Sequence, residues 1–106
     1  MRLAILSSLF FLGCATVHFE PRAADGFLER IDGGRRYYVY RPAEWTPDKK
    51  WPLIVYLHGG DERGSDGVKP TQVGLGPHVW RQHGRFPYVV LFPQAPARSF
   101  WAFKQE

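Results

Sequence analysis

The stretch that decides the fold is Leu-Ile-Val-Tyr-Leu-His-Gly-Gly, residues 53–60. Its first five residues are apolar without alternation, which is typical of a strand that is covered on both faces, as in a parallel sheet. The run ends in His58 and two glycines, which allow the backbone to turn tightly. A second apolar run, residues 88–92, is ended by Pro93. We therefore predict two buried strands, at 53–57 and 88–92.

The segments around these two strands predict the rest of the topology. About thirty residues separate the runs, enough for a right-handed crossover, and residues 77–83, between two glycines, are the best helix candidate. Ahead of them, residues 27–31 and 37–41 are strand-like, and the Asp-Gly-Gly-Arg sequence at 32–35 suits a hairpin turn. The predicted fold class is α/β, with an antiparallel hairpin followed by a βαβ unit.

The predicted elements leave this sheet short of covering layers. A parallel strand buried on both faces needs helices on both faces and neighbouring strands at both edges. One short helix would leave residues 53–57 and 88–92 partly uncovered. We therefore expect residues 26–106 to be the N-terminal portion of a larger α/β domain.

Composition excludes several classes of protein. The chain of 106 residues is 44% hydrophobic, which excludes a disordered polymer. Its net charge of +4 comes from scattered residues, so we expect no nucleic-acid partner. Cys14 is the only cysteine, which excludes a disulfide scaffold. His58, His78 and His83 do not have the spacing of a zinc site, and no metal or other cofactor is predicted.

The first residues predict export. An apolar run at residues 3–12 follows Arg2; it is too short to span a bilayer and suits the core of a signal peptide. Phe-Leu-Gly-Cys, ending at Cys14, resembles a bacterial lipobox, with Phe in place of the usual Leu. This predicts a signal peptide at 1–13, lipidation of Cys14 and a tether at 14–25. The expected location is the outer membrane, as a lipoprotein, or the periplasm or medium after an ordinary secretory cleavage; a buried N-terminal strand with an inert cysteine is the remaining alternative.

The candidate site follows the strand at 53–57. Ligands in open α/β sheets bind at the carboxyl ends of the strands, and Gly59 and Gly60 allow backbone N–H groups to approach a ligand closely. The functional interpretation is an oxyanion hole with donors from Gly60 and Asp61. The alternative is a simple strand-ending turn in which His58 packs and caps, and Asp61 with its two charged neighbours forms a solvated ion cluster.

Three motifs in one order resemble the N-terminal part of α/β-hydrolases. The nearest resemblance is to the bacterial predicted-peptidase and esterase branch, close to the phospholipase/carboxylesterase, feruloyl esterase and polyhydroxyalkanoate depolymerase groups. The motifs are Arg-Tyr-Tyr-Val-Tyr-Arg-Pro at 36–42, Trp-Pro-Leu-Ile-Val-Tyr-Leu-His-Gly-Gly at 51–60 and Glu-Arg-Gly at 62–64.

The resemblance implies a role for each residue of the loop. The N–H of Gly60 or Asp61 would supply one oxyanion donor, and His58 and Gly59 would shape the loop. The family's nucleophile lies in a later Gly-x-Ser-x-Gly elbow, and its acid and base come later still. No such segment is present in this chain, and neither Ser65 nor Ser99 has the context of a nucleophile.

The resemblance gives the main functional hypothesis, which is an exported serine hydrolase acting on a small ester or a peptide, without a cofactor. In it, this chain contributes the oxyanion loop and is truncated before the nucleophile elbow. The alternative is a membrane-anchored module, binding or vestigial, that has no catalytic activity.

Overall fold

A computed structural model describes residues 19–102. Within them, four strands form one mixed sheet in the order β1-β2-β4-β3. The predicted signal peptide, the lipidation site Cys14 and the first part of the predicted tether lie outside the described residues. No helix in the described part of the chain is both long and apolar enough to cross a bilayer.

The hairpin predicted from the glycines forms the first half of the sheet. Strand β1 (Phe27–Asp32) pairs antiparallel with β2 (Arg35–Tyr40), and Asp32 lies opposite Arg35. Gly33 and Gly34 have φ angles of 54° and 75°, the positive values that a two-residue turn between strands requires. The prediction of a hairpin is confirmed.

The second half of the sheet is the predicted βαβ unit. Strand β3 (Leu53–Val55) pairs in parallel with β4 (Val89–Phe92), and the helix α1 (Leu75–Arg81) lies between them in sequence. Strand β4 also pairs antiparallel with β2, so it joins the hairpin to the parallel pair. The predicted α/β class is confirmed.

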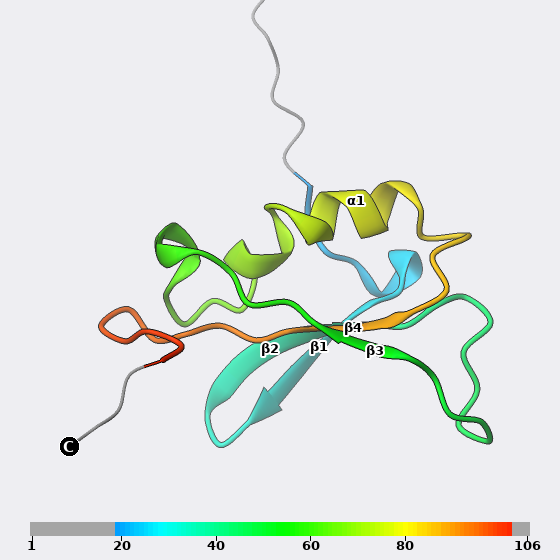
Figure 1. Cartoon of the computed structure of the whole chain (residues 1–106), viewed down its shortest axis with the longest axis horizontal. Helices are drawn as coiled ribbons and strands as arrows, with labels where there is room; N and C mark the ends of the chain where they lie inside the picture. Colours follow the sequence, from blue (N-terminus) through cyan, green and yellow to red (C-terminus); the bar gives the residue numbers. More distant parts are fainter. Residues whose placement is uncertain (1–18, 103–106) are drawn as a thin grey trace, which may run out of the picture.

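Three short 3-10 turns complete the described elements and lie with α1 on one face of the sheet (Figure 1). They are η1 (Ala23–Asp25), η2 (Gly60–Glu62) and η3 (Lys69–Thr71). The helix α1 begins two residues earlier than predicted, at Leu75. Pro77 therefore lies inside its first turn, where the backbone N–H that proline lacks would have no partner within the helix.

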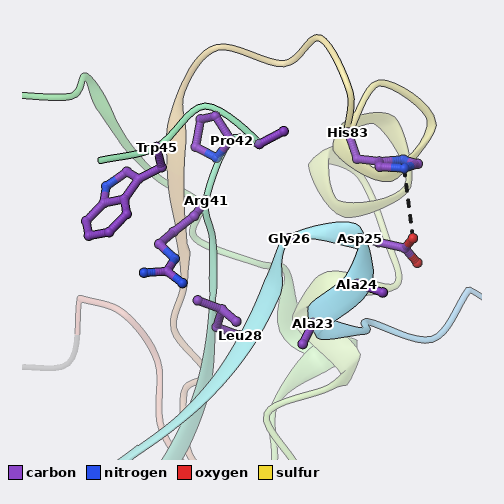
Figure 2. Close-up of a pocket in the computed structure, with 10 residues that line it drawn as sticks. Ala23, Ala24, Asp25, Gly26, Leu28, Arg41, Pro42, Trp45 and His83 are labelled. Atoms are coloured by element: carbon purple, nitrogen blue, oxygen red, sulfur yellow. Dashed lines mark ion pairs between the residues drawn. The ribbon is translucent and has the colours of Figure 1, made fainter. Parts of the chain in front are cut away.

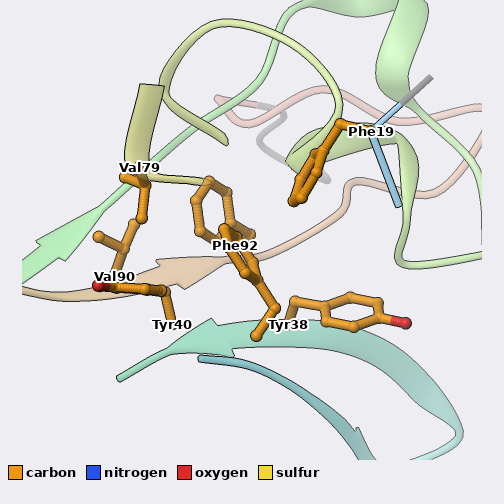
Figure 3. Packing of buried hydrophobic residues seen from close by; sticks show 7 residues of the cluster. Phe19, Tyr38, Tyr40, Val79, Val90 and Phe92 are labelled. Carbon is orange, nitrogen blue, oxygen red and sulfur yellow. The ribbon is translucent and has the colours of Figure 1, made fainter. Parts of the chain in front are cut away.

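Aromatic side chains form the core between the sheet and α1 (Figure 3). Phe27 on β1 lies 5.3 Å from Tyr40 and 6.0 Å from Phe92 between ring centroids. The hydroxyl of Tyr40 donates a 2.8 Å hydrogen bond to the carbonyl of His83, just after α1. The buried cluster comprises Phe19, Phe27, Tyr38, Tyr40, Val79, Val90 and Phe92.

The core reaches further toward the N-terminus than the sequence suggested. Phe19 is buried, its ring lies 5.1 Å from that of Phe27, and its carbonyl accepts a hydrogen bond from Gln72. Asp25 is also buried. The folded part therefore includes residues 19–25. The sequence analysis had assigned these residues to a tether at 14–25, with the domain starting at residue 26.

The prediction that strand 53–57 is covered on both faces is wrong for the described residues. Only residues 53–55 form the strand, and Leu53, Val55 and Leu57 are 58%, 50% and 54% exposed. Ile54 and Tyr56, whose side chains point the other way, pack against the core. The reason is that α1 covers one face, while no helix of the described chain covers the other. The expectation that these strands would be partly uncovered is confirmed.

Candidate active site

The predicted oxyanion loop lies where β3 and β4 both end. Because the two strands are parallel, the segment after Val55 and the segment after Phe92 leave the sheet at the same edge. Gly59 is extended, with φ −79° and ψ −176°, and η2 begins at the next residue. The structure thus places Gly60 and Asp61 in the first two positions of a helical turn at the carboxyl edge of the sheet.

Those positions leave two backbone donors available. The first N–H groups of a helical turn have no partner within the turn. The N–H of Glu62 bonds to the carbonyl of Gly59 at 3.4 Å, but the N–H groups of Gly60 and Asp61 make no hydrogen bond with the described residues. Gly60 and Asp61 are both exposed. Two adjacent free N–H groups are the arrangement that can bind an oxyanion.

His58 holds the start of this loop. It is 4% exposed, its Nδ1 lies 2.6 Å from the carbonyl oxygen of Gly59, and its Nε2 accepts a 2.9 Å hydrogen bond from the N–H of Ala95. Both ring nitrogens are therefore occupied by backbone groups, which leaves neither free to take a proton from a serine. Within the described part of the chain, no serine hydroxyl is hydrogen-bonded to a histidine.

A small hollow of about 50 Å³ lies beside the loop. It is lined by His58, Gly59, Gly60, Arg63, Ala95, Ser99, Phe100 and Trp101. Among them, Trp101 has its ring 4.8 Å from the His58 ring, and its Nε1 donates to the His58 carbonyl at 2.9 Å. Ser99 lines this hollow, whereas Ser65 is an exposed loop residue.

The three charged residues at 61–63 do not form the ion cluster of the alternative interpretation. Arg63 donates to the carbonyl of Gly60 at 2.8 Å and lies over the ring of Phe100 at 4.9 Å. The three ion pairs of the described residues include neither Asp61, Glu62 nor Arg63. Arg63 therefore ties the turn through a carbonyl, not through a carboxylate.

Gln94, which the sequence did not mark as a site residue, is hydrogen-bonded to the loop and to the segment after it. Gln94 follows β4, and its side-chain amide bonds to the backbone of Glu62 and Gly67 and to the carboxylate of Asp66. No local pattern marks it, because these partners are about thirty positions away.

A second hollow of about 230 Å³ lies at the opposite end of the sheet, next to the start of β1 and the end of β2. Figure 2 shows Trp45 and Arg41 on one side of it and Asp25 with His83 on the other. The Arg41 guanidinium lies 4.4 Å from the Trp45 ring centroid. The carboxylate of Asp25 is paired with Arg22 at 2.9 Å. The side chains of Arg41, Trp45 and Asp25 are thus engaged in contacts of the fold. The hollow lies away from the carboxyl edge that carries the loop.

Comparison with known proteins gives one close similarity. No family model matches the chain, and no curated protein matches it. Among solved structures, the chain is similar to a thermostable esterase, with a TM-score of 0.56 and 36% sequence identity. The similarity covers 73% of this chain and 23% of the esterase, so the chain spans less than a quarter of the length of that protein. The described residues therefore have a hydrolase-like α/β fold.

Proposed function

We propose that this chain carries the oxyanion loop of a serine hydrolase that acts on small esters, with peptides as the second substrate class. The observation that carries the proposal is the pair of free N–H groups of Gly60 and Asp61 at the carboxyl edge of the sheet. The similarity to a thermostable esterase supports the choice of esters. No cofactor takes part.

The proposed mechanism divides the work between this loop and a nucleophile outside the described residues. A serine hydroxyl would give its proton to a base, also outside the described residues, and its oxygen would bond to the ester carbonyl carbon. The carbon would become tetrahedral and the carbonyl oxygen an oxyanion, and the C=O bond would re-form as the alcohol leaves with that proton. One N–H of the Gly60–Asp61 pair would bind that oxyanion, and the residue after the nucleophile would supply a second N–H. His58 would shape the loop without exchanging protons, since both of its ring nitrogens bond to backbone groups.

Gly60→Pro tests the donor directly. Proline removes the N–H, fits the first position of a helical turn, and tolerates an extended residue before it, as Gly59 is. Gly60→Ala is the matched control, because it keeps the N–H and its Cβ would meet nothing within 4 Å. A backbone ester at Asp61, made with the α-hydroxy analogue of aspartate, removes the other N–H.

The assay is hydrolysis of p-nitrophenyl esters by the protein produced from its gene. Removing the working donor should lower kcat about 10²- to 10³-fold, and Gly60→Ala should stay near wild type. If neither donor removal lowers kcat, the loop is not an oxyanion hole. If the wild-type protein hydrolyses no ester or peptide and takes no fluorophosphonate label, the non-catalytic module becomes the better description.

We also propose that the protein is exported and held at the outer membrane by a lipid on Cys14. The support is the short apolar run at 3–12 followed by Gly13 and Cys14. Metabolic labelling with a clickable fatty acid should label the wild type and not Cys14→Ser, and fractionation should move that variant out of the membrane. Equal labelling of both proteins would contradict the anchor, and retention of both in the cytoplasm would contradict export.

A further inference from the structure

The amide of Gln94 makes hydrogen bonds with the last residue of the turn η2 and with two residues of the segment that follows it. Its Nε2 donates to the carbonyl of Glu62 at 2.8 Å and to Oδ1 of Asp66 at 3.0 Å, while its Oε1 accepts from the N–H of Gly67 at 2.6 Å. Both amide hydrogens and the amide oxygen are thus used. A primary amide is the side-chain group that can donate twice and accept at the same time.

These bonds fix the far end of the turn that carries the two free N–H groups. Glu62 is the last residue of η2, which begins at Gly60. At the near end, His58 bonds to the carbonyl of Gly59. Both ends of a three-residue turn are therefore restrained, and the direction of its first N–H groups is set by these restraints.

The surrounding backbone leaves room for the amide and adds a further bond. Gly64 has a φ of 150°, and a Cβ there would lie 3.3 Å from the Gln94 nitrogen. The N–H of Gly64 also bonds to the carbonyl of Ala95 at 2.9 Å. The segment after β4 therefore holds the loop through two adjacent residues, by the side chain of Gln94 and by the backbone carbonyl of Ala95.

Asp66 gives the amide a fixed, charged partner. Its Oδ1 also accepts from the N–H groups of Val68 at 2.9 Å and Lys69 at 3.2 Å. Burial raises the pKa of Asp66, but the hydrogen bonds from Lys69, Gln94 and Val68 outweigh it and hold the pKa below the usual range. A carboxylate at position 94 would face this anion and the Glu62 carbonyl with no hydrogen to donate.

We propose that Gln94 is a positioning residue, whose amide orients the turn Gly60–Glu62 so that the free N–H groups face the reacting carbonyl. The inference rests on the function proposed above for this loop. In this role Gln94 acts through the turn and not on the substrate, so its effect is expected on kcat more than on KM.

The test compares Gln94→Glu with Gln72→Glu in the protein produced from the whole gene. The control makes the same chemical change and also removes a side-chain bond to a carbonyl, that of Phe19 at 3.0 Å, with no bond to the loop. In ¹H–¹⁵N spectra, Gln94→Glu should shift the Gly60 and Asp61 resonances, while the core amides of Val90 and Phe92 stay unchanged. The control should leave the loop resonances in place.

The kinetic part of the test uses the pH profile. At neutral pH, Gln94→Glu should lower kcat for ester hydrolysis at least tenfold and change KM less than twofold. As the pH falls, the ratio of variant to wild-type kcat should rise, because a protonated carboxyl again offers one donor and one acceptor. The nearby Asp66 carboxylate would raise the pKa of the introduced carboxyl. That carboxyl would therefore become protonated, and kcat would recover, at a less acidic pH.

The outcomes separate this inference from the proposed function. If the wild type is active but Gln94→Glu changes neither the loop amides nor kcat, the positioning role is wrong and the proposed function stands. If Gln94→Glu and Gln72→Glu perturb all amides alike, the role of Gln94 is general stability, which overturns the inference. If Gln94→Glu moves the loop amides alone and the wild type is inactive on every ester and peptide, the hold on the loop is supported and the hydrolase function fails.

Discussion

The Nε2 atom of His58 accepts a hydrogen bond of 2.9 Å from the backbone N–H of Ala95, which links the segment after β3 to the segment after β4. Since Nδ1 faces the carbonyl of Gly59, the ring must carry its hydrogen on Nδ1 and none on Nε2. These two bonds fix the orientation of the ring. Through it, the sheet sets the position of the loop that carries the candidate oxyanion donors.

His58→Ala should destabilise the fold by removing the acceptor of a buried N–H. Ala95 is 3% exposed, and a buried donor left without a partner costs about 1–3 kcal/mol. The free energy of unfolding, measured by urea denaturation, should fall by about that amount. A change below about 0.5 kcal/mol, the size seen at ordinary surface positions, would mean that water replaces the imidazole there.

Local patterns in the sequence were enough to predict the hairpin, the parallel pair and the edge that carries the candidate site, but not the pairing of β2 with β4 that joins the two halves of the sheet. Two consecutive glycines after residue 32 mark the hairpin turn, and two runs of consecutive apolar residues mark the parallel strands. The number of residues between the runs indicates the crossover. The contacts of Gln94 could not be predicted, because its partners Glu62 and Asp66 lie 32 and 28 positions away. The exposure of Leu53 could not be predicted either, because an apolar run does not show which face of the strand is covered by another layer.

The start of α1 was also decided by a contact that no local pattern shows. Gly76 packs so closely on Thr71 that a Cβ would overlap the Thr71 carbonyl group. Only a glycine allows η3 and the first turn of α1 to approach in this way. The helix can therefore include Gly76, although glycine is a poor helix former, and the predicted start at residue 77 was two residues late.

Gly76→Ala should therefore destabilise the protein even though alanine favours helices. The clash is with backbone, which cannot rotate away, so we expect a loss of about 1–3 kcal/mol, as for overpacked cores. Gly84→Ala is the control, since its Cβ would meet nothing within 4 Å and its φ is not positive; it should change stability by less than about 0.5 kcal/mol. Thermal or urea unfolding of both variants measures the difference, and equal stabilities would contradict the close approach.

Asp25 should make the stability of the fold depend on acid pH. Burial raises its pKa, but hydrogen bonds from Arg22 and Trp80 and the charges of Arg22 and His83 outweigh burial and hold the pKa below its ordinary value of 3.8. A carboxyl with a lowered pKa in the folded state contributes stability that is fully present above 3.8 and is lost as the pH falls through the folded value.

The variant that isolates this effect is Asp25→Asn, which keeps the size of the side chain and cannot ionise. Its stability relative to wild type should be lower at pH 6, and the difference should shrink as the pH approaches 2. Arg22→Met should reduce the acid dependence in the same direction, because the Arg22 side chain donates two bonds to Asp25 Oδ2. Urea midpoints recorded from pH 2 to 7 provide the measurement, and a difference that is constant with pH would rule out the ionised pair as its source.

The exposed face of β3 should control self-association. Pro52 and Tyr56 bond to β4, so the N–H and C=O groups of Leu53 and Val55, which alternate with them, point to the free edge. Half-exposed aliphatic side chains beside an unpaired edge are a template for pairing with another chain. Val55→Lys places a charge on this face, and Ile54→Lys places one on the face that packs against the core.

For the 106-residue chain, Val55→Lys should raise the highest concentration at which sedimentation velocity shows only monomer, and it should leave the urea midpoint almost unchanged. Ile54→Lys should instead lower the midpoint strongly, because it forces an unpaired charge toward the aromatic core. The contrast between adjacent residues is what the alternation of a strand covered on one face requires. If the two variants lowered the midpoint equally, the face of Val55 would be packed in solution as tightly as that of Ile54, and the free edge would not be the cause of any association.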